Sequence, residues 1–217
     1  VSQYDGLVIR SKFRVDKAFL DLASNLKFIA RVGAGMENID VQYAESKGIR
    51  CLNAPQGNAN AVGEHALGML LCLFRNITKA DGEVRKGQWI REENRGVELD
   101  GKTIGVIGYG NTGKAFCRKL RGFDVTVLAY DKYLEGYADK FVEEASLDQL
   151  RAQVDVLSLH LPLTEETKGM VDEKFIRSFK KSIYIINTAR GDVIQTEAVA
   201  NALEDGRVKG ACLDVLE

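Results

Sequence analysis

One stretch of this 217-residue chain constrains the fold more than any other, and it runs from Thr103 to Asp131. A short apolar run leads into Gly108, Gly110 and Gly113, spaced G-x-G-x-x-G, and a helical pattern and a second apolar run follow. The first glycine permits a tight turn, the second lets a pyrophosphate approach the backbone, and the third lets helix and strand pack closely. Asp131 stands where an acid accepts hydrogen bonds from an adenosine ribose, roughly 20 positions later. We predict a dinucleotide site; a turn without a ligand is the alternative.

From about residue 96 onward, apolar runs alternate with helical patterns, which predicts a Rossmann-type doubly wound parallel sheet. Ser146 with Gln149 forms a capping box, and Asp172 and Thr196 are expected to cap the later helices. We expect strands at 103–107, 125–130, 154–159, 183–187 and 208–215, and helices from the glycine turn to 122, at 147–151, at 174–179 and at 197–203.

The part before residue 57 also alternates, and it predicts a partial, flavodoxin-like α/β substrate domain that is incomplete at its amino end. We expect strands at 6–9, 26–32 and 49–52, and helices at 15–23 and 41–47. Residues 58–86 are apolar on more than one helix face, which favours one long helix between the domains, buried on several sides and part of a subunit interface. The domains are then residues 1–95 and 96–217.

Composition narrows the functional classes. The formal charge is −1 with 28% charged residues, which gives no indication of a nucleic-acid or membrane partner. Four cysteines are scattered without metal-ligand spacing, so reduced core thiols in a cytoplasmic protein are expected, and no metal. No signal peptide, P-loop or H-E-x-x-H motif is present.

Polar residues follow four of the predicted strands, at the edge where open α/β sheets bind ligands. They are Asp131, His160, Thr188 with Arg190, and Asp214. Arginine's planar fork suits the carboxylate and ketone of a 2-oxo acid, so Arg190 is the candidate substrate anchor. Asp214 lies in an apolar run, and a buried carboxylate there needs a donor. A nicotinamide carboxamide or a structural hydrogen bond would supply it.

The two histidines have different expected roles. His160 ends a strand at the presumed cleft and contacts either the cofactor or a structural partner, whereas His65 is expected to be a core histidine with its hydrogen bonds satisfied. Neither is expected to be the general acid of a carbonyl reduction. Gly33 and Gly35 follow a strand in the first domain, where backbone N–H groups could face an anion or form a plain turn.

Together these motifs resemble the D-isomer-specific 2-hydroxyacid dehydrogenases, most of all their phosphoglycerate dehydrogenase branch. The resemblance rests on V-I-R-S at 8–11, G-A-G-M-E-N-I-D at 33–40, G-Y-G-N-T-G at 108–113, S-L-H-L-P-L-T at 158–164, N-T-A-R-G at 187–191 and G-A-C-L-D-V at 210–215. It implies a homodimer that transfers a hydride between NAD and C2 of a D-2-hydroxy acid. The implied substrate is 3-phosphoglycerate, in serine biosynthesis. Glyoxylate or hydroxypyruvate reduction and an NAD-sensing, corepressor-like interaction protein are the alternatives.

The resemblance also implies roles for individual residues. Arg190 would be the catalytic arginine that holds the substrate carboxylate and carbonyl. Substrate contacts would come from Arg10, Val32 and Gly33. Cofactor contacts would come from Gly108, Gly110, Asn111, Thr112, Gly113, Asp131, His160, Pro162, Thr167, Thr188, Ala189 and Asp214, with Ala34 near the nicotinamide. Because Asp131 would repel a 2′-phosphate, NAD is expected over NADP.

Some features depart from the family pattern. Asn111 stands where the family often has Arg or His, and Phe13 replaces a small polar residue. The family's acid–base histidine and its partner glutamate would lie beyond Glu217, which is not expected to be that glutamate. Both ends of the chain look cut, so these 217 residues alone are expected not to turn over substrate, while NAD binding is expected to survive if the shortened sheet folds.

Overall fold

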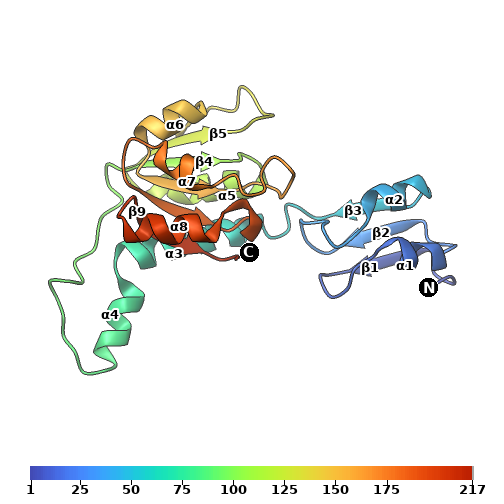
Figure 1. The fold of residues 1–217 in the computed structure, drawn as a ribbon. Coiled ribbons are helices and arrows are strands. Elements are labelled where there is room, and N and C mark those ends of the chain that lie inside the picture. The colour runs from blue at the N-terminus through green and yellow to red at the C-terminus, as the bar shows by residue number, and fades with distance from the viewer. Residues whose placement is uncertain (217) are drawn as a thin grey trace. The chain divides into compact units, whose positions relative to one another are not determined.

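The computed structural model describes residues 1–216, which fold into two compact units that divide after Ala59 (Figure 1). Glu217, and with it the expectation about its role, lies outside the described residues. In the first unit a parallel sheet has the order β1-β2-β3, from β1 (Gly6–Ile9), β2 (Phe28–Arg31) and β3 (Arg50–Asn53). The helices are α1 (Lys17–Leu22) and α2 (Val41–Ser46).

Asp16 and Asp40 determine where these two helices begin, because each side chain accepts a backbone N–H three residues later, at 3.0 Å. The first helix therefore starts at residue 17, later than the apolar pattern predicts. Fully buried Val15, Leu20 and Ile29 form the centre of a small core between helices and sheet. The α/β alternation predicted for this part is confirmed.

The second unit contains a larger parallel sheet with the order β6-β5-β4-β7-β8-β9 in the described chain. Its strands are β4 (Thr103–Ile107), β5 (Thr126–Tyr130), β6 (Val142–Glu144), β7 (Val156–Leu159), β8 (Ile183–Asn187) and β9 (Val208–Leu213). The strand order reverses between β4 and β7, which is the point where doubly wound sheets bind nucleotides. The predicted sheet is confirmed, although β6 is too short to be recognised from its sequence.

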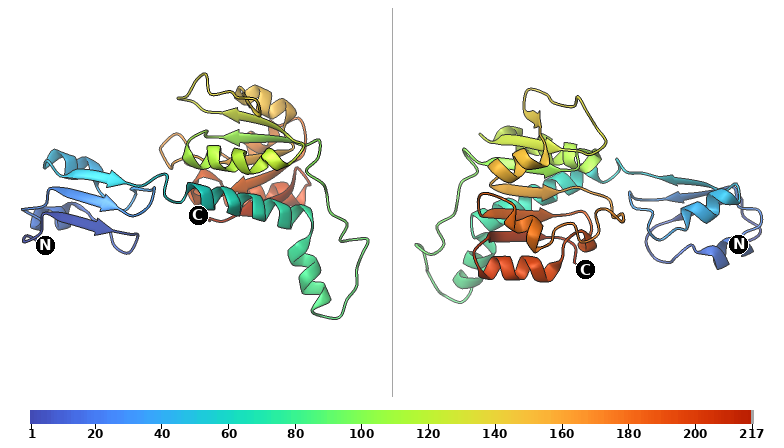
Figure 2. Two further views of the ribbon diagram at one scale, coloured as in Figure 1. Left: turned by 180° about the vertical axis from the view of Figure 1, so that it is seen from behind. Right: turned by 45° about the horizontal axis from the view of Figure 1, so that its top comes forward.

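Helices cover both faces of this sheet (Figure 2). On one face α3 (Ala59–Phe74) and α5 (Asn111–Lys119) pack around Ile104, Val106 and Ile186. On the other face α6 (Leu147–Gln153), α7 (Glu173–Arg177) and α8 (Thr196–Glu204) pack around Leu157 and Ile185. Short 3₁₀ turns occupy Leu120–Gly122 and Gly191–Val193.

The single long helix predicted over residues 58–86 is wrong. The chain forms α3 and then α4 (Ile77–Val84), separated by Asn76 in the left-handed conformation with φ 53°. Asparagine tolerates this conformation, and its side chain donates to the Arg95 carbonyl at 3.3 Å. In α3 the fully buried positions follow one helical stripe against the larger sheet, namely Ala66, Leu70 and Phe74. Leu67, Met69, Leu71 and Leu73 on either side of this stripe are partly buried against the same core, so the helix packs over a broad face.

Two of the three predicted caps are confirmed. Ser146 and Gln149 form the capping box of α6, and Asp172 accepts the Phe175 N–H at 2.6 Å. The third is wrong, because Gln195 is the N-cap of α8 and Thr196 is already its first helical residue. Among the described residues, no helix is long and apolar enough to cross a membrane.

Candidate functional site

The glycine turn follows β4 at the reversal point of the larger sheet. Gly108 has φ 93°, and a Cβ there would lie 2.4 Å from the His160 carbonyl oxygen. A Cβ on Gly113 would lie 2.1 Å from the Gly108 carbonyl oxygen, whereas one on Gly110 meets no described atom within 4 Å. The first and third glycines are therefore required by the fold, and the second leaves open space. That space lies beside the first turn of α5, where Asn111, Thr112 and Gly113 carry backbone N–H groups without intrahelical acceptors. Such a helix N-terminus favours a phosphate.

Asp131 directly follows β5, and both of its carboxylate oxygens accept backbone N–H groups. Oδ2 accepts the Tyr109 N–H at 2.8 Å, and Oδ1 accepts the N–H groups of Tyr133 at 2.9 Å and Leu134 at 3.1 Å. These bonds fix the carboxylate beside the glycine turn. Carboxylate oxygens can accept further hydrogen bonds, so Asp131 stays competent to bind a ribose diol.

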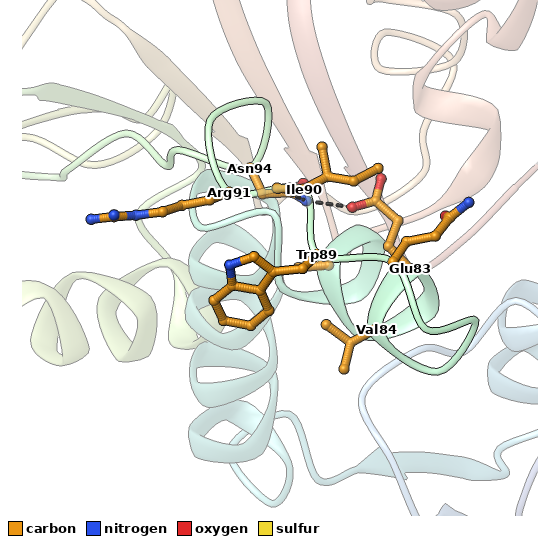
Figure 3. Close-up of a pocket in the computed structure, with 8 residues that line it drawn as sticks. Glu83, Val84, Trp89, Ile90, Arg91 and Asn94 are labelled. Carbon is orange, nitrogen blue, oxygen red and sulfur yellow. Dashed lines mark hydrogen bonds between the residues drawn. The ribbon is translucent and has the colours of Figure 1, made fainter.

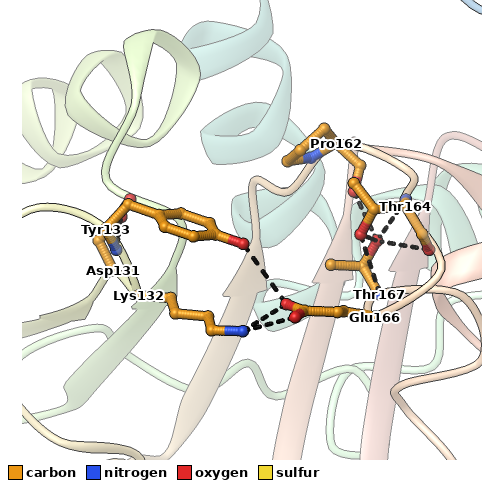
Figure 4. A network of polar contacts seen from close by, with 7 residues as sticks. All are labelled: Asp131, Lys132, Tyr133, Pro162, Thr164, Glu166 and Thr167. Carbon is orange, nitrogen blue, oxygen red and sulfur yellow. Dashed lines mark hydrogen bonds and ion pairs between the residues drawn. The ribbon is translucent and has the colours of Figure 1, made fainter.

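Pro162 and Thr167, two predicted cofactor contacts, bind each other in the loop after β7. The Thr167 hydroxyl donates to the Pro162 carbonyl at 2.7 Å and accepts the Thr164 N–H at 2.8 Å (Figure 4). The loop is thus shaped by its own threonines. In the same loop Glu166 forms an ion pair with Lys132, which follows β5.

His160 is buried at the carboxyl end of β7. Its Nε2 lies 2.9 Å from the Ser158 hydroxyl, and its ring lies 5.4 Å from that of Phe116. Burial lowers the pKa of His160 to about 4, so the ring is neutral at pH 7. Its Nδ1 is buried with no partner among the described residues. A neutral ring with an unpaired nitrogen can bind a ligand amide or hydroxyl, but it cannot act as a general acid at neutral pH.

Thr188, Ala189 and Arg190 form the turn after β8, next to β7. Asn187, which is fully buried, accepts the Ala189 N–H at 3.0 Å and donates to the Arg190 carbonyl at 2.9 Å. The Arg190 guanidinium donates to the Ala189 carbonyl at 2.7 Å. Thr188 Oγ1 is a buried atom with no partner among the described residues. Because residues 159 and 187 are paired in the sheet, Thr188 and His160 follow neighbouring strand ends.

Asp214 and His65 differ from their predictions. β9 ends at Leu213, so Asp214 lies at the sheet edge, and its side chain is 48% exposed instead of buried. The side chain of His65 is 53% exposed, because it lies outside the buried stripe of α3, so it is not a core histidine. The two meet, with Nε2 of His65 3.2 Å from Oδ1 of Asp214.

In the first unit, the predicted substrate residues follow the ends of β1 and β2. Arg10 is exposed, and its carbonyl accepts a hydrogen bond from Asn38 at 3.2 Å. Val32 is 55% exposed, and its carbonyl accepts from the Arg31 guanidinium at 2.7 Å. Gly33 has φ 150°, and a Cβ there would lie 2.1 Å from Arg31 Nη1. The carbonyl of Ala34 accepts from Asn53 at 2.7 Å.

The four cysteines are free thiols. Cys117 and Cys212 are buried as predicted, and burial raises their pKa values to about 12 and about 11. Cys51 and Cys72 are half-buried, so the core prediction holds for only two of the four.

Several residues that shape the candidate site were not identified from the sequence. Asn187 organises the turn that presents Arg190, and its place in N-T-A-R-G was the available signal. Ser158 holds the ring of His160, and Glu166 pairs with Lys132, the cation next to Asp131, across 34 positions of sequence, which no local pattern indicates.

The reversed strand order, the glycine turn and the acid after β5 define a dinucleotide-binding domain of the Rossmann class. Comparison with known proteins identifies the family to which the chain belongs within this class. Residues 67–217 match the family model described as the D-isomer specific 2-hydroxyacid dehydrogenase, NAD binding domain. This chain belongs to that family, and NAD is its cofactor.

Three similar proteins illustrate the relationship. The chain is 40% identical to the hydroxypyruvate reductase of Thermotoga maritima, over 100% of this chain and 71% of that protein. It is 39% identical to the D-3-phosphoglycerate dehydrogenase of Mycobacterium tuberculosis, over 99% of this chain and 41% of that protein. The crystal structure of the D-lactate dehydrogenase from Aquifex aeolicus with NAD and lactic acid aligns with a TM-score of 0.90 at 32% identity, covering 100% of this chain and 66% of that one. The chain thus spans about two fifths of the phosphoglycerate dehydrogenases that it matches.

Proposed function

We propose that the whole protein is an NAD-dependent oxidoreductase that transfers a hydride between NAD and C2 of a D-2-hydroxy acid. The observation that carries this proposal is the grouping at one sheet edge of the glycine turn, Thr188 and Arg190, within a chain of this family. When bound, NAD supplies the hydride acceptor. The first turn of α5 would bind its pyrophosphate and Asp131 its adenosine ribose.

The nicotinamide end would meet the other predicted cofactor residues. His160 Nδ1 and Thr188 Oγ1, two buried atoms without partners in the described part of the chain, support this placement, because such polar groups favour a ligand or water there. We propose that Asp214, held by His65, accepts from the carboxamide. Arg190 would hold the substrate carboxylate and carbonyl in its planar fork. An acid–base group other than His160 would move the hydroxyl proton, because the pKa of His160 is about 4.

For the substrate we propose 3-phosphoglycerate, with hydroxypyruvate or glyoxylate as the second candidate. Arg10 and the neighbouring Arg31 add cations at the carboxyl edge of the smaller sheet, which favours a phosphorylated acid. The likeness to a protein named hydroxypyruvate reductase supports the second candidate. The domains that we propose are a substrate domain in residues 1–95 and a coenzyme domain in residues 96–217, although α3 packs with the sheet of the second compact unit.

We further propose that the protein is a cytoplasmic homodimer. In the second unit, α4 and the segment after it project from the sheet (Figures 1 and 2). Trp89 is 82% exposed there, beside Val84 and a pocket also lined by Ile90 and Asn94 (Figure 3). An exposed tryptophan on an apolar patch is typical of a subunit interface. Analytical ultracentrifugation of the wild type and of Trp89→Glu tests this, and a dimer that survives the substitution would contradict it.

Steady-state assays test the proposed reaction. The full-length protein, with NADH and a panel of 2-oxo acids, should reduce 3-phosphohydroxypyruvate, hydroxypyruvate or glyoxylate. Titration with both cofactors should show tighter binding of NAD, because Asp131 repels a 2′-phosphate. Equal or tighter binding of NADP would overturn that preference.

A further inference from the structure

Lys132 and Glu166 form an ion pair between two loops, at the end of the proposed cofactor site where the adenosine would bind. Lys132 follows β5, Glu166 lies in the loop after β7, and both strands flank β4. Nζ of Lys132 lies 2.7 Å from Oε1 and 2.5 Å from Oε2 of Glu166, and the Tyr133 hydroxyl is 3.4 Å from Oε2 (Figure 4). Strands separated by one neighbour are about 10 Å apart, so this pair spans the carboxyl edge of β4.

Stability does not explain this contact. The two side chains are 53% and 60% exposed, and exposed ion pairs contribute little to stability. The hydrogen bond from Lys132 lowers the pKa of Glu166, and the same bond raises the pKa of Lys132, so both groups are charged near pH 7. We therefore expect the pair to act through its electrostatic effect on a bound ligand.

The position of this ion pair determines which part of a bound cofactor would interact with its charges. Asp131 is fixed beside the glycine turn, and Lys132 is the next residue. A lysine at this position would be available to the 2′-phosphate that distinguishes NADP from NAD. Here its ammonium is paired with the carboxylate of Glu166, which lies in the loop after β7.

We propose that Glu166 is a specificity-determining residue that disfavours NADP by pairing with the ammonium of Lys132, which would otherwise be available to a 2′-phosphate. This inference rests on the NAD site described above. Asp131 alone would repel a phosphate while Lys132 attracted it, and Glu166 removes that compensation.

Calorimetric titration of the full chain with NAD and NADP tests the proposal. Glu166→Gln should tighten NADP binding about tenfold, a modest gain because both side chains are exposed and water screens their charges, and leave NAD affinity within twofold. The matched control is Glu165→Gln, an exposed neighbour in the same loop, which should change neither affinity more than twofold. Adding Lys132→Gln to Glu166→Gln should abolish the gain.

The outcomes separate this inference from the proposed function. If Glu166→Gln leaves the ratio of the two affinities unchanged, or if Glu165→Gln has an equal effect, Glu166 is not the determinant although NAD binding stands. A gain that persists without Lys132 also overturns the proposal. A wild-type chain that binds neither dinucleotide overturns both.

Discussion

The glycine turn allows a substitution whose cost follows from the geometry. In Gly113→Ala the new methyl group would lie 2.1 Å from the Gly108 carbonyl oxygen and 3.4 Å from Val106 Cγ1. The colliding atom is backbone, so the turn or α5 must move by about 1 Å. Such overpacking costs about 3 kcal/mol, and the better helix propensity of alanine returns about 1 kcal/mol. We therefore expect a net loss of about 2 kcal/mol in the free energy of unfolding, and weaker NAD binding because the turn is displaced.

Gly110→Ala provides the comparison for Gly113→Ala, because it should affect NAD binding without affecting stability. Gly110 has φ −78°, which any residue adopts, and its Cβ would meet no described atom within 4 Å. Its stability should stay within about 0.5 kcal/mol of the wild type, whereas NAD affinity should fall at least tenfold because the methyl group occupies pyrophosphate space. Gly122→Ala, also in open space, should change neither property.

Urea unfolding without cofactor, and calorimetry with NAD, measure the two effects separately. The reasoning is refuted if Gly113→Ala is as stable as the wild type. It is equally refuted if Gly110→Ala binds NAD with unchanged affinity, since the open space would then not be the pyrophosphate site.

The other predictions concern single side chains. Arg190→Lys in the full-length protein should lose most of kcat/KM with little change in NAD affinity, because lysine lacks the planar fork; steady-state kinetics and titration check this. His160 binds a proton at its ordinary pKa of 6.5 when unfolded but only near pH 4 when folded, so stability is full above pH 6.5 and falls by about 2–4 kcal/mol toward pH 4. Urea midpoints across this range should lose most of that slope in His160→Gln. Cys117 and Cys212 should react with a thiol reagent at pH 8 at least 100-fold more slowly in the native than in the unfolded protein, as timed labelling would show.

The sequence predicted the features that local rules control. The glycine spacing, the acid after β5 and the capping box each depend on residues close together in the chain, and the structure confirms the turn and the box. The break at Asn76 was missed, because the apolar pattern continues past a single residue in a left-handed conformation.

Side-chain environments at the site were harder to predict, because they depend on tertiary packing. His65 was expected in the core, but it lies outside the buried stripe of α3 and its side chain meets Asp214 at the end of β9. Asp214 was expected inside a strand that in fact ends one residue earlier. The pairing of Lys132 with Glu166 arises only when the two loops meet over β4.

The most direct test of the central claim is NADH consumption by the full-length protein with single 2-oxo acids, followed by chiral analysis of the product. We predict turnover of at least one of 3-phosphohydroxypyruvate, hydroxypyruvate and glyoxylate, with D-stereochemistry wherever the product is chiral. A protein that binds NADH but reduces none of these acids would contradict the account, and would favour an NAD-sensing interaction protein instead.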